Sequence, residues 1–198
     1  MKYFWNFIGV FLLSSFVFIT LGLRTDIAYA TEDELPSYSY QVPEEEQGKI
    51  LQRNIETIML KKSLTREVPQ YSSYDYVPIA TKYATGAGYA GNRSISGTRF
   101  PTGGGFFWSG SGGPSVSASV SFGITPISIG ISLGNSSSSG KFVTVPNTTN
   151  YFKLRVQKTN KVVQTAVYGY PITGGNRVFL YYIYPSTLYS ESAWAERQ

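Results

Sequence analysis

Short apolar runs, of which those at 115–134 and 151–157 alternate with polar positions, occupy the chain after residue 75 and predict a mainly β protein. Short runs rich in Val, Ile, Tyr and Phe are separated by clusters of Gly, Pro, Asn and Ser, as in antiparallel hairpins. We therefore expect an antiparallel β-sandwich or a small barrel. The expected strands are 77–84, 105–109, 115–124, 127–133, 141–145, 151–157, 161–168 and 177–184, with short turns at 158–160 and 174–176.

One segment has helical periodicity instead and predicts a short amphipathic helix. Three acids at 44–46 open it and Lys61 and Lys62 close it, which suits the helix macrodipole. Residues 64–75, with Pro69 and repeated Tyr and Ser, then predict a linker. The acidic segment 31–75 is either an ordinary helix packed on the β domain or a pro-segment that masks it. The apolar residues of the predicted helix are Ile50, Leu51, Ile55, Ile58 and Met59.

The first 30 residues have the pattern of an export signal. Lys2 precedes an apolar run at 7–23, and Ala28-Tyr29-Ala30 offers the small residues that signal peptidase accepts. We expect cleavage after Ala30 and a secreted chain that begins at Thr31; an uncleaved anchor is the alternative. Export without Cys is unusual where disulfides form readily, and suits a Gram-positive bacterium, with the protein extracellular or associated with the cell wall.

The composition excludes much of ordinary site chemistry. The 198 residues include no His and no Cys, so a Ser-His-Asp triad, a thiol nucleophile and a thiolate zinc site are all impossible. Residues 76–190 also contain no Asp or Glu, so the β domain (76–198) offers no carboxylate between Asp75 and Glu191 for hydrolysis or for metal binding. We therefore expect a non-enzymatic protein with no cofactor and no metal.

The charges are segregated along the chain. Residues 31–70 carry eight acids and five bases, whereas residues 71–198 carry ten bases and three acids. A domain of one sign attracts anionic surfaces, although surface cations also serve simply to keep a sheet soluble. We expect an anionic cell-wall polymer or lipid surface as the partner; a secreted protein seldom meets nucleic acid. The candidate binding residues are Lys153, Arg155, Lys158, Lys161 and Arg177.

The clearest pattern lies at 115–134, where apolar side chains alternate with Ser and Gly. It predicts two amphipathic strands with a turn or bulge between them, near Thr125-Pro126. The pattern suits a core hairpin of a sandwich, or a hairpin that inserts into a membrane with one face toward lipid. It resembles the insertion segment of aerolysin-like toxins over about 20 residues. The candidate membrane-facing residues are Val116, Val120, Phe122, Ile124, Ile127, Ile129, Ile131 and Leu133.

Together these features predict a secreted, non-enzymatic β protein that binds an anionic cell-envelope surface, as a bacteriocin-like or toxin-like factor or a wall-associated module. Two alternatives remain open from the sequence. One is membrane permeabilisation by the 115–134 hairpin after assembly, and the other is a structural or inhibitory secreted protein. The sequence predicts neither the target nor the oligomeric state.

Overall fold

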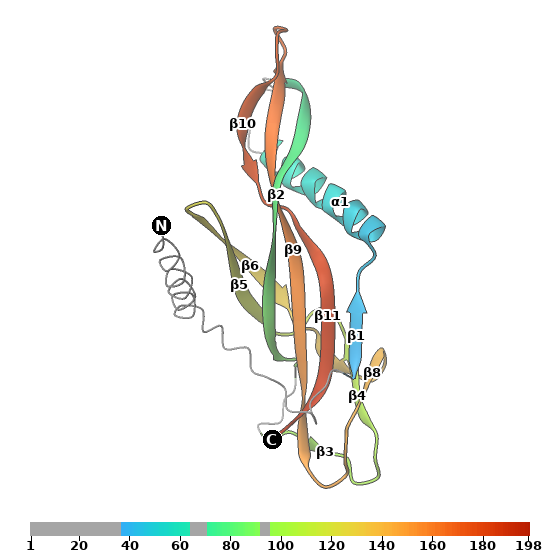
Figure 1. The fold of residues 1–198 in the computed structure, drawn as a ribbon. Helices are drawn as coiled ribbons and strands as arrows, with labels where there is room; N and C mark the ends of the chain where they lie inside the picture. The colour runs from blue at the N-terminus through green and yellow to red at the C-terminus, as the bar shows by residue number, and fades with distance from the viewer. Residues whose placement is uncertain (1–36, 64–70, 92–95) are drawn as a thin grey trace, which may run out of the picture. The chain divides into compact units, whose positions relative to one another are not determined.

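The computed structural model describes residues 37–63, 71–91 and 96–198. The signal peptide predicted at 1–30 and most of the predicted linker lie outside the described residues. Within them the protein is mainly β, with eleven strands and one helix (Figure 1). The predicted mainly β, antiparallel fold is confirmed, whereas the predicted alternative of a small closed barrel is wrong, since the described sheets stay open.

The largest sheet is organised around one long strand, β9 (Tyr151–Pro171). Along one edge β9 pairs with β2 (Tyr71–Tyr89) and then with the short β3 (Thr98–Arg99). Along the other edge it pairs with β10 (Val178–Ile183) and with β11 (Ser186–Arg197). All of these pairs are antiparallel, so β9 is hydrogen-bonded on both sides over most of its length.

The turn predicted at residues 158–160 is wrong, because these residues lie in the middle of β9. Lys158 lies opposite Gly86 on one side and opposite Glu191 on the other. Two neighbouring strands satisfy the backbone groups here, which outweighs the turn preference of Asn160. The turn predicted at 174–176 is confirmed: it joins β9 to β10, and Gly174 and Gly175 adopt positive φ angles of 82° and 107°.

Two smaller sheets pack against this large sheet. One consists of β4 (Gly105–Ser109) between β7 (Asn135–Ser137) and β8 (Lys141–Thr144). Its fully buried Trp108 belongs to the same core cluster as Phe152, Leu154 and Val156 of β9. The other is the hairpin of β5 (Ser115–Phe122) and β6 (Thr125–Ser132), which forms a separate two-stranded sheet.

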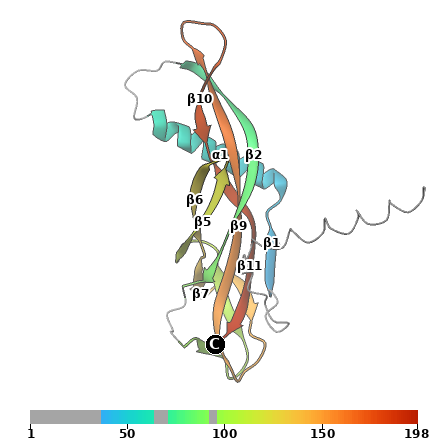
Figure 2. The ribbon, with the colours of Figure 1, turned by 60° about the vertical axis from the view of Figure 1, so that its left-hand side comes forward.

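The N-terminal described segment is built onto the large sheet. The edge strand β1 (Tyr38–Gln41) pairs with β11, and the predicted helix is present as α1 (Glu44–Ser63). Helix α1 crosses the upper part of the sheet (Figure 2) and buries Ile55 against Val167 and Ile183. Its Glu45 pairs with Lys49 inside the helix.

The interpretation of segment 31–75 as a mask of the β domain stays a prediction.

Residues 71–75, expected in the linker, instead begin strand β2. The helix predicted between 44 and 62 is the one helix of the described residues, and it lacks the combination of length and apolarity that a bilayer crossing requires.

Candidate functional site

The β5–β6 hairpin has two chemically distinct faces. Its register places Val116 opposite Ile131 and Val120 opposite Ile127, so the apolar residues of both strands share one face. The other face carries exposed Ser and Gly residues, and two of its hydroxyls, Ser117 Oγ and Ser128 Oγ, lie 2.7 Å apart. The sequence prediction of two amphipathic strands is therefore confirmed, with an uncharged polar face toward solvent.

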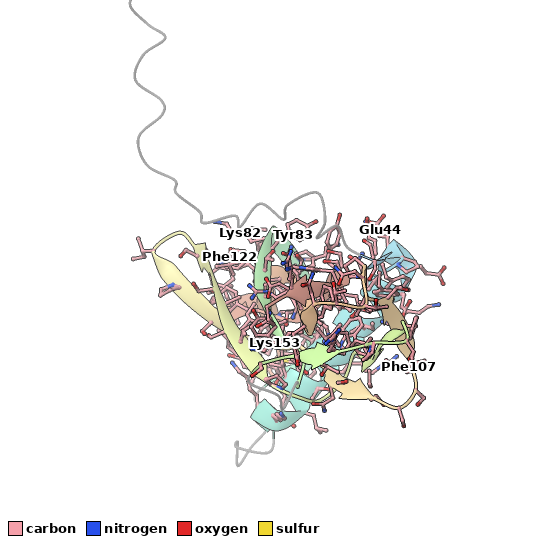
Figure 3. The ribbon with its side chains drawn as sticks, turned by 90° about the horizontal axis from the view of Figure 1, so that it is seen from below. Glu44, Lys82, Tyr83, Phe107, Phe122 and Lys153 are labelled. Atoms are coloured by element: carbon pink, nitrogen blue, oxygen red, sulfur yellow. The ribbon has the colours of Figure 1, made fainter. Side chains whose placement is uncertain are left out.

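The apolar face of the hairpin packs on the large sheet. Val120 and Phe122 form a cluster with Ala84 and Val162, and the Phe122 ring lies 5.4 Å from that of Tyr184. Figure 3 views the structure along the strands, with the hairpin to one side of the large sheet and Phe122 near Lys82.

Two glycines of β2 make this close approach possible. A Cβ atom at Gly86 would lie 2.5 Å from Val116 Cγ2, and one at Gly88 would lie 2.6 Å from Leu133 Cδ1. Both positions must therefore stay without side chains for the hairpin to pack as it does. The Gly-x-Gly sequence at 86–88 is part of a strand that receives the hairpin.

The turn of the hairpin differs from the predicted one. Strands 115–124 and 127–133 were expected, but the turn is Gly123-Ile124, with a φ of 62° at Gly123. A two-residue turn with Gly at its first position suits antiparallel strands, and it outweighs the apolar pattern that extended the predicted strand. Ile124, predicted to lie on the apolar face, is instead fully exposed at the tip (101 % relative accessibility).

The hairpin is attached to the sheet differently from every strand of that sheet. Among the described residues, β5 and β6 pair only with each other. The hydrogen bonds at its base are local: Leu133 N donates to Pro114 O at 2.9 Å and Gly134 N to Gly112 O at 3.0 Å. Side-chain packing, rather than a backbone ladder, thus holds the hairpin on β2.

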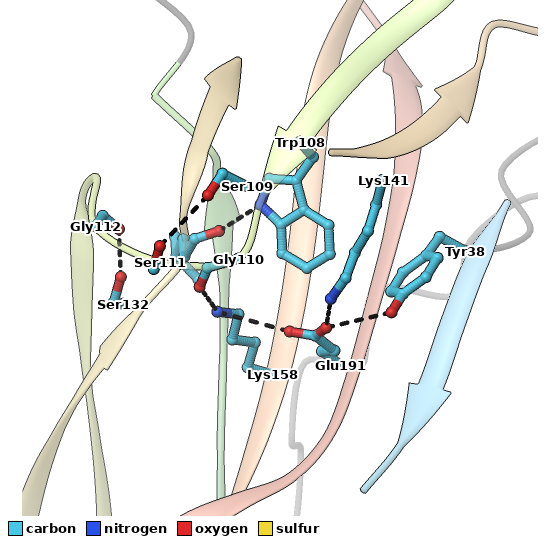
Figure 4. Close-up of polar contacts among 11 residues, drawn as sticks. Tyr38, Trp108, Ser109, Gly110, Ser111, Gly112, Ser132, Lys141, Lys158 and Glu191 are labelled. Carbon is cyan, nitrogen blue, oxygen red and sulfur yellow. Dashed lines mark hydrogen bonds and ion pairs between the residues drawn. The ribbon is translucent and has the colours of Figure 1, made fainter. Parts of the chain in front are cut away.

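A buried charge cluster lies beneath the base of the hairpin (Figure 4). The Glu191 side chain is 3 % exposed; it accepts a hydrogen bond from Lys141 and lies 3.7 Å from Lys158 Nζ. The Tyr38 hydroxyl donates to the same carboxylate at 3.4 Å. The Trp108 ring lies close to both ammonium groups, 4.8 Å from that of Lys141 and 5.5 Å from that of Lys158. We call these five residues the Glu191 cluster.

The Glu191 cluster contacts the segments on both sides of the hairpin. Lys158 Nζ donates to the carbonyl oxygen of Gly110, in the segment that leads into β5. Trp108 Nε1 donates at 3.0 Å to the carbonyl oxygen of Leu133, directly after β6. The cluster therefore fixes where the hairpin begins and ends.

Burial and charge act in opposite directions on the two lysines. Burial alone lowers the pKa of Lys141, but the hydrogen bonds to Glu191 and Tyr38 outweigh it, and the pKa is raised. For Lys158 burial dominates over the attraction of Glu191, and its pKa is lowered. Glu191 is thus the counter-charge of the buried Lys158 and of the partly exposed Lys141.

The structure brings only some of the predicted anion-binding residues together. Lys153 and Arg155 flank Tyr89, each 5.1 Å from its ring, and Arg155 also lies 3.7 Å from Glu196. The remaining three are placed apart: Lys158 is buried in the Glu191 cluster, Lys161 lines a groove beside Tyr83 and Tyr189, and Arg177 pairs with Asp75 at 2.7 Å beside the β9–β10 turn.

Sequence reasoning missed the Glu191 cluster, although one signal for it existed. Glu191 ends a run of 115 residues that has no carboxylate and many cations, so it was the obvious counter-charge for a buried lysine. Its partners Tyr38, Trp108 and Lys141 come from distant segments, and no spacing in the sequence links them.

The comparisons with known proteins add no relative. No family model, no curated protein and no solved structure matches the chain. The described residues also contain no group of three or more His, Cys, Asp or Glu side chains that could hold a metal ion. The function must therefore be argued from the geometry of this chain alone.

Proposed function

We propose that this protein permeabilises membranes, and that the β5–β6 hairpin of several copies supplies the membrane-spanning strands. The observation that carries the proposal is the attachment of the hairpin. It is a two-faced hairpin held on the sheet by side chains, so it can leave without breaking a strand pair of the sheet. Once released, its apolar face needs a new apolar environment, and a bilayer provides one.

The absence of charged side chains around the hairpin supports this proposal. Residues 100–140 contain no charged side chain, so the hairpin and both of its flanking segments could enter a low-dielectric phase without burying a charge. Each strand has eight residues, and a tilted membrane strand needs about 9–11. The hydrogen bond from Leu133 N to Pro114 O at 2.9 Å already extends the pairing by one residue beyond each strand.

A disulfide that locks the hairpin to β2 tests the proposal. A Cβ atom at Gly86 would lie 3.6 Å from Ile131 Cβ, within the range for a disulfide, and the chain has no other Cys. We would combine Gly86→Cys and Ile131→Cys with Val116→Ala, which removes the methyl group that the new Cβ would meet. Dye release from phosphatidylcholine vesicles that contain phosphatidylglycerol is the readout.

We expect the oxidised variant to release little dye and the reduced variant to release it as the unmodified protein does. The two samples have the same sequence, so any dye release caused by the apolar residues 7–23 is the same in both. Equal release by the oxidised and reduced samples would contradict the proposal, as would an unmodified protein that never causes leakage. A Cys-free variant with Val116→Ala alone serves as the control for the reductant.

A charge at the hairpin tip gives a second test that does not alter the folded structure. Ile124 is fully exposed, so Ile124→Asp should leave the free energy of unfolding within about 0.5 kcal/mol of the original. If the tip must cross the bilayer, the added charge should slow dye release strongly. The matched control is Ile124→Ser, which removes the apolar group without adding a charge and should have a smaller effect.

Binding to an anionic cell-envelope polymer stays a second proposal, supported by the Lys153 and Arg155 pair around Tyr89. It is tested by co-sedimentation with purified cell walls across a salt series. We expect retention that weakens with salt and is reduced in Lys153→Gln with Arg155→Gln, because such attraction is screened. Retention that ignores salt would contradict it.

A further inference from the structure

The end of the sheet at the β9–β10 turn carries an exposed apolar and aromatic surface. Four of its side chains are strongly exposed: Ile172 at 61 %, Phe179 at 47 %, Tyr182 at 45 % and Val178 at 42 %. The Phe179 ring lies 4.9 Å from that of Tyr182 and 5.8 Å from that of Tyr168. We call these five residues the aromatic end. The rings of Phe179, Tyr182 and Tyr168 form one exposed aromatic group, and such groups mark interaction surfaces.

The aromatic end is not the face of β10 that the helix covers. Helix α1 packs with Ile58 and Met59 against Leu180 and Tyr181, which lie between Phe179 and Tyr182 in the sequence. Phe179 and Tyr182 instead contact each other and, through Phe179, Tyr168 of β9. Within the described residues, the outer face of this hairpin therefore stays open to solvent.

Arg177 lies beside the aromatic end. Its guanidinium lies 4.6 Å from the ring of Tyr168 and is paired with the carboxylate of Asp75 at 2.7 Å. Lys62, at the last turn of α1, lies over the ring of Tyr181 and so belongs to the face of β10 that the helix covers. The exposed rings and apolar side chains of the aromatic end suit the interface of a bilayer, where amphipathic rings lie at the headgroup level.

The hairpin of the proposed function points toward this same end. Its base contacts Gly86 and Gly88, and its tip lies at Tyr184 and Lys82, so it runs from the Tyr89 end of β2 toward the Tyr71 end. Tyr71 pairs with Pro171, where the β9–β10 turn begins. Figures 1 and 2 both show the turn of the hairpin directed toward the end that carries the β9–β10 turn.

We propose that the aromatic end is the surface by which this protein docks on the interface of a lipid bilayer, before the hairpin is released. This inference rests on the proposed function, because the bilayer is chosen as the partner partly from the direction of the hairpin. Docking through this end brings the tip of the hairpin, with Ile124, to the side that faces the membrane.

The experiment measures vesicle binding by co-sedimentation, separately from dye release. Phe179→Ser with Tyr182→Ser removes two exposed rings of the aromatic end. We expect it to weaken binding at least about tenfold, because the apolar area that the two rings would bury in the bilayer interface is lost. The matched control is Phe107→Ser with Phe142→Ser. These two rings are also exposed, at 41 % and 45 %, but they lie on the β4–β8 sheet, and Phe107 is labelled in Figure 3. The control should bind as the original does.

The outcomes separate the two proposals. Original-strength binding by the Phe179→Ser, Tyr182→Ser variant, or an equal loss in the control, overturns docking at the aromatic end whatever the leakage result. Binding that depends on Phe179 and Tyr182 without any leakage keeps this inference and overturns the proposed function. A variant that loses binding to cells but not to protein-free vesicles shows a glycan or protein receptor, and also overturns bilayer docking. Circular dichroism and urea unfolding confirm that each variant is folded.

Discussion

The β5–β6 hairpin and strand β9 share an alternating apolar pattern but are attached in different ways. Both contain alternating apolar residues with a buried face. Strand β9 has backbone partners on both edges, whereas the hairpin strands pair only with each other and rest on β2 through side chains. A strand inside a ladder can leave only when its hydrogen bonds break, but a hairpin packed on a sheet can leave as a unit.

The difference shows that strands with the same alternating pattern can be attached in different ways. The alternating pattern of a strand shows which face is buried, and it does not show whether the backbone hydrogen bonds lead to a neighbouring element. In this protein the two kinds of attachment meet at the Glu191 cluster, which joins β9 and β11 to the base of the hairpin.

Removing the charge of Glu191 should have the largest effect on this comparison. Glu191→Gln leaves the buried Lys158 and the partly exposed Lys141 without their counter-charge, and the free energy of unfolding should fall by about 3–5 kcal/mol. Urea unfolding measures it. The control is Glu45→Gln, which breaks an exposed pair on α1 and should cost no more than about 0.5 kcal/mol. Equal effects of the two substitutions would contradict the structural role of Glu191.

Two matched isoleucines test whether the hairpin opens independently. Ile131 in the hairpin is 2 % exposed and Ile183 in β10 is 4 % exposed, so each substitution by Ala should cost about 2–5 kcal/mol. Amide hydrogen exchange distinguishes them. We expect Ile131→Ala to accelerate exchange in 115–132, and Ile183→Ala to accelerate exchange in β9 while leaving 115–132 unchanged. If Ile183→Ala accelerates both regions equally, the hairpin opens only with the whole sheet.

Substitutions at Gly86 and Gly130 test the same comparison with a smaller expected change in stability. Gly86→Ala places a methyl group 2.5 Å from Val116 Cγ2 and should destabilise the packed hairpin by about 1–3 kcal/mol, with faster dye release. Gly130→Ala lies on the open Ser face, where no atom lies within 4 Å of the new Cβ, and it should be neutral or slightly stabilising. Faster release by Gly130→Ala and not by Gly86→Ala would reverse our assignment of the two faces.

The smallest expected effect concerns how the Asp75–Arg177 pair, beside the aromatic end, makes the stability depend on pH. The hydrogen bonds from Arg177 and Tyr170 hold the pKa of Asp75 below its ordinary value of 3.8. A lowered pKa in the folded state means that the stabilisation is complete above pH 3.8 and is lost as the pH falls through the lowered value. Thermal midpoints of the original and of Asp75→Asn should therefore differ slightly at neutral pH and converge in acid. A difference that grows in acid would contradict this assignment.

Local patterns predicted much of the fold. The alternation at 115–134 predicted both faces of the hairpin, and Gly174-Gly175-Asn176 predicted the β9–β10 turn. The acids at 44–46 and the lysines at 61–62 predicted the limits of the helix within a residue or two. Each of these signals depends on residues that are close in sequence, so no tertiary information was needed.

The remaining features depend on contacts between distant segments. Strand β11 was missed because its inward positions include Thr187 and Glu191, which hide the apolar alternation. Residues 158–160 were predicted as a turn because their partners, β2 and β11, lie far away in the sequence. The Glu191 cluster depends on five strands at once, and no local pattern encodes it.

The position of β9 late in the sequence determines the order in which this chain can fold. Strand β2 ends at Tyr89, and its partner begins only at Tyr151, so β2 leaves the ribosome long before the strand with which it pairs. Tyr71 of β2 can pair with Pro171 of β9 only after residue 171 has been synthesised. Pairings of such long sequence separation form slowly, because much chain entropy is lost before the first contact is gained. During translation the apolar face of residues 115–132 thus emerges before strand β9, on which the large sheet depends, has been made.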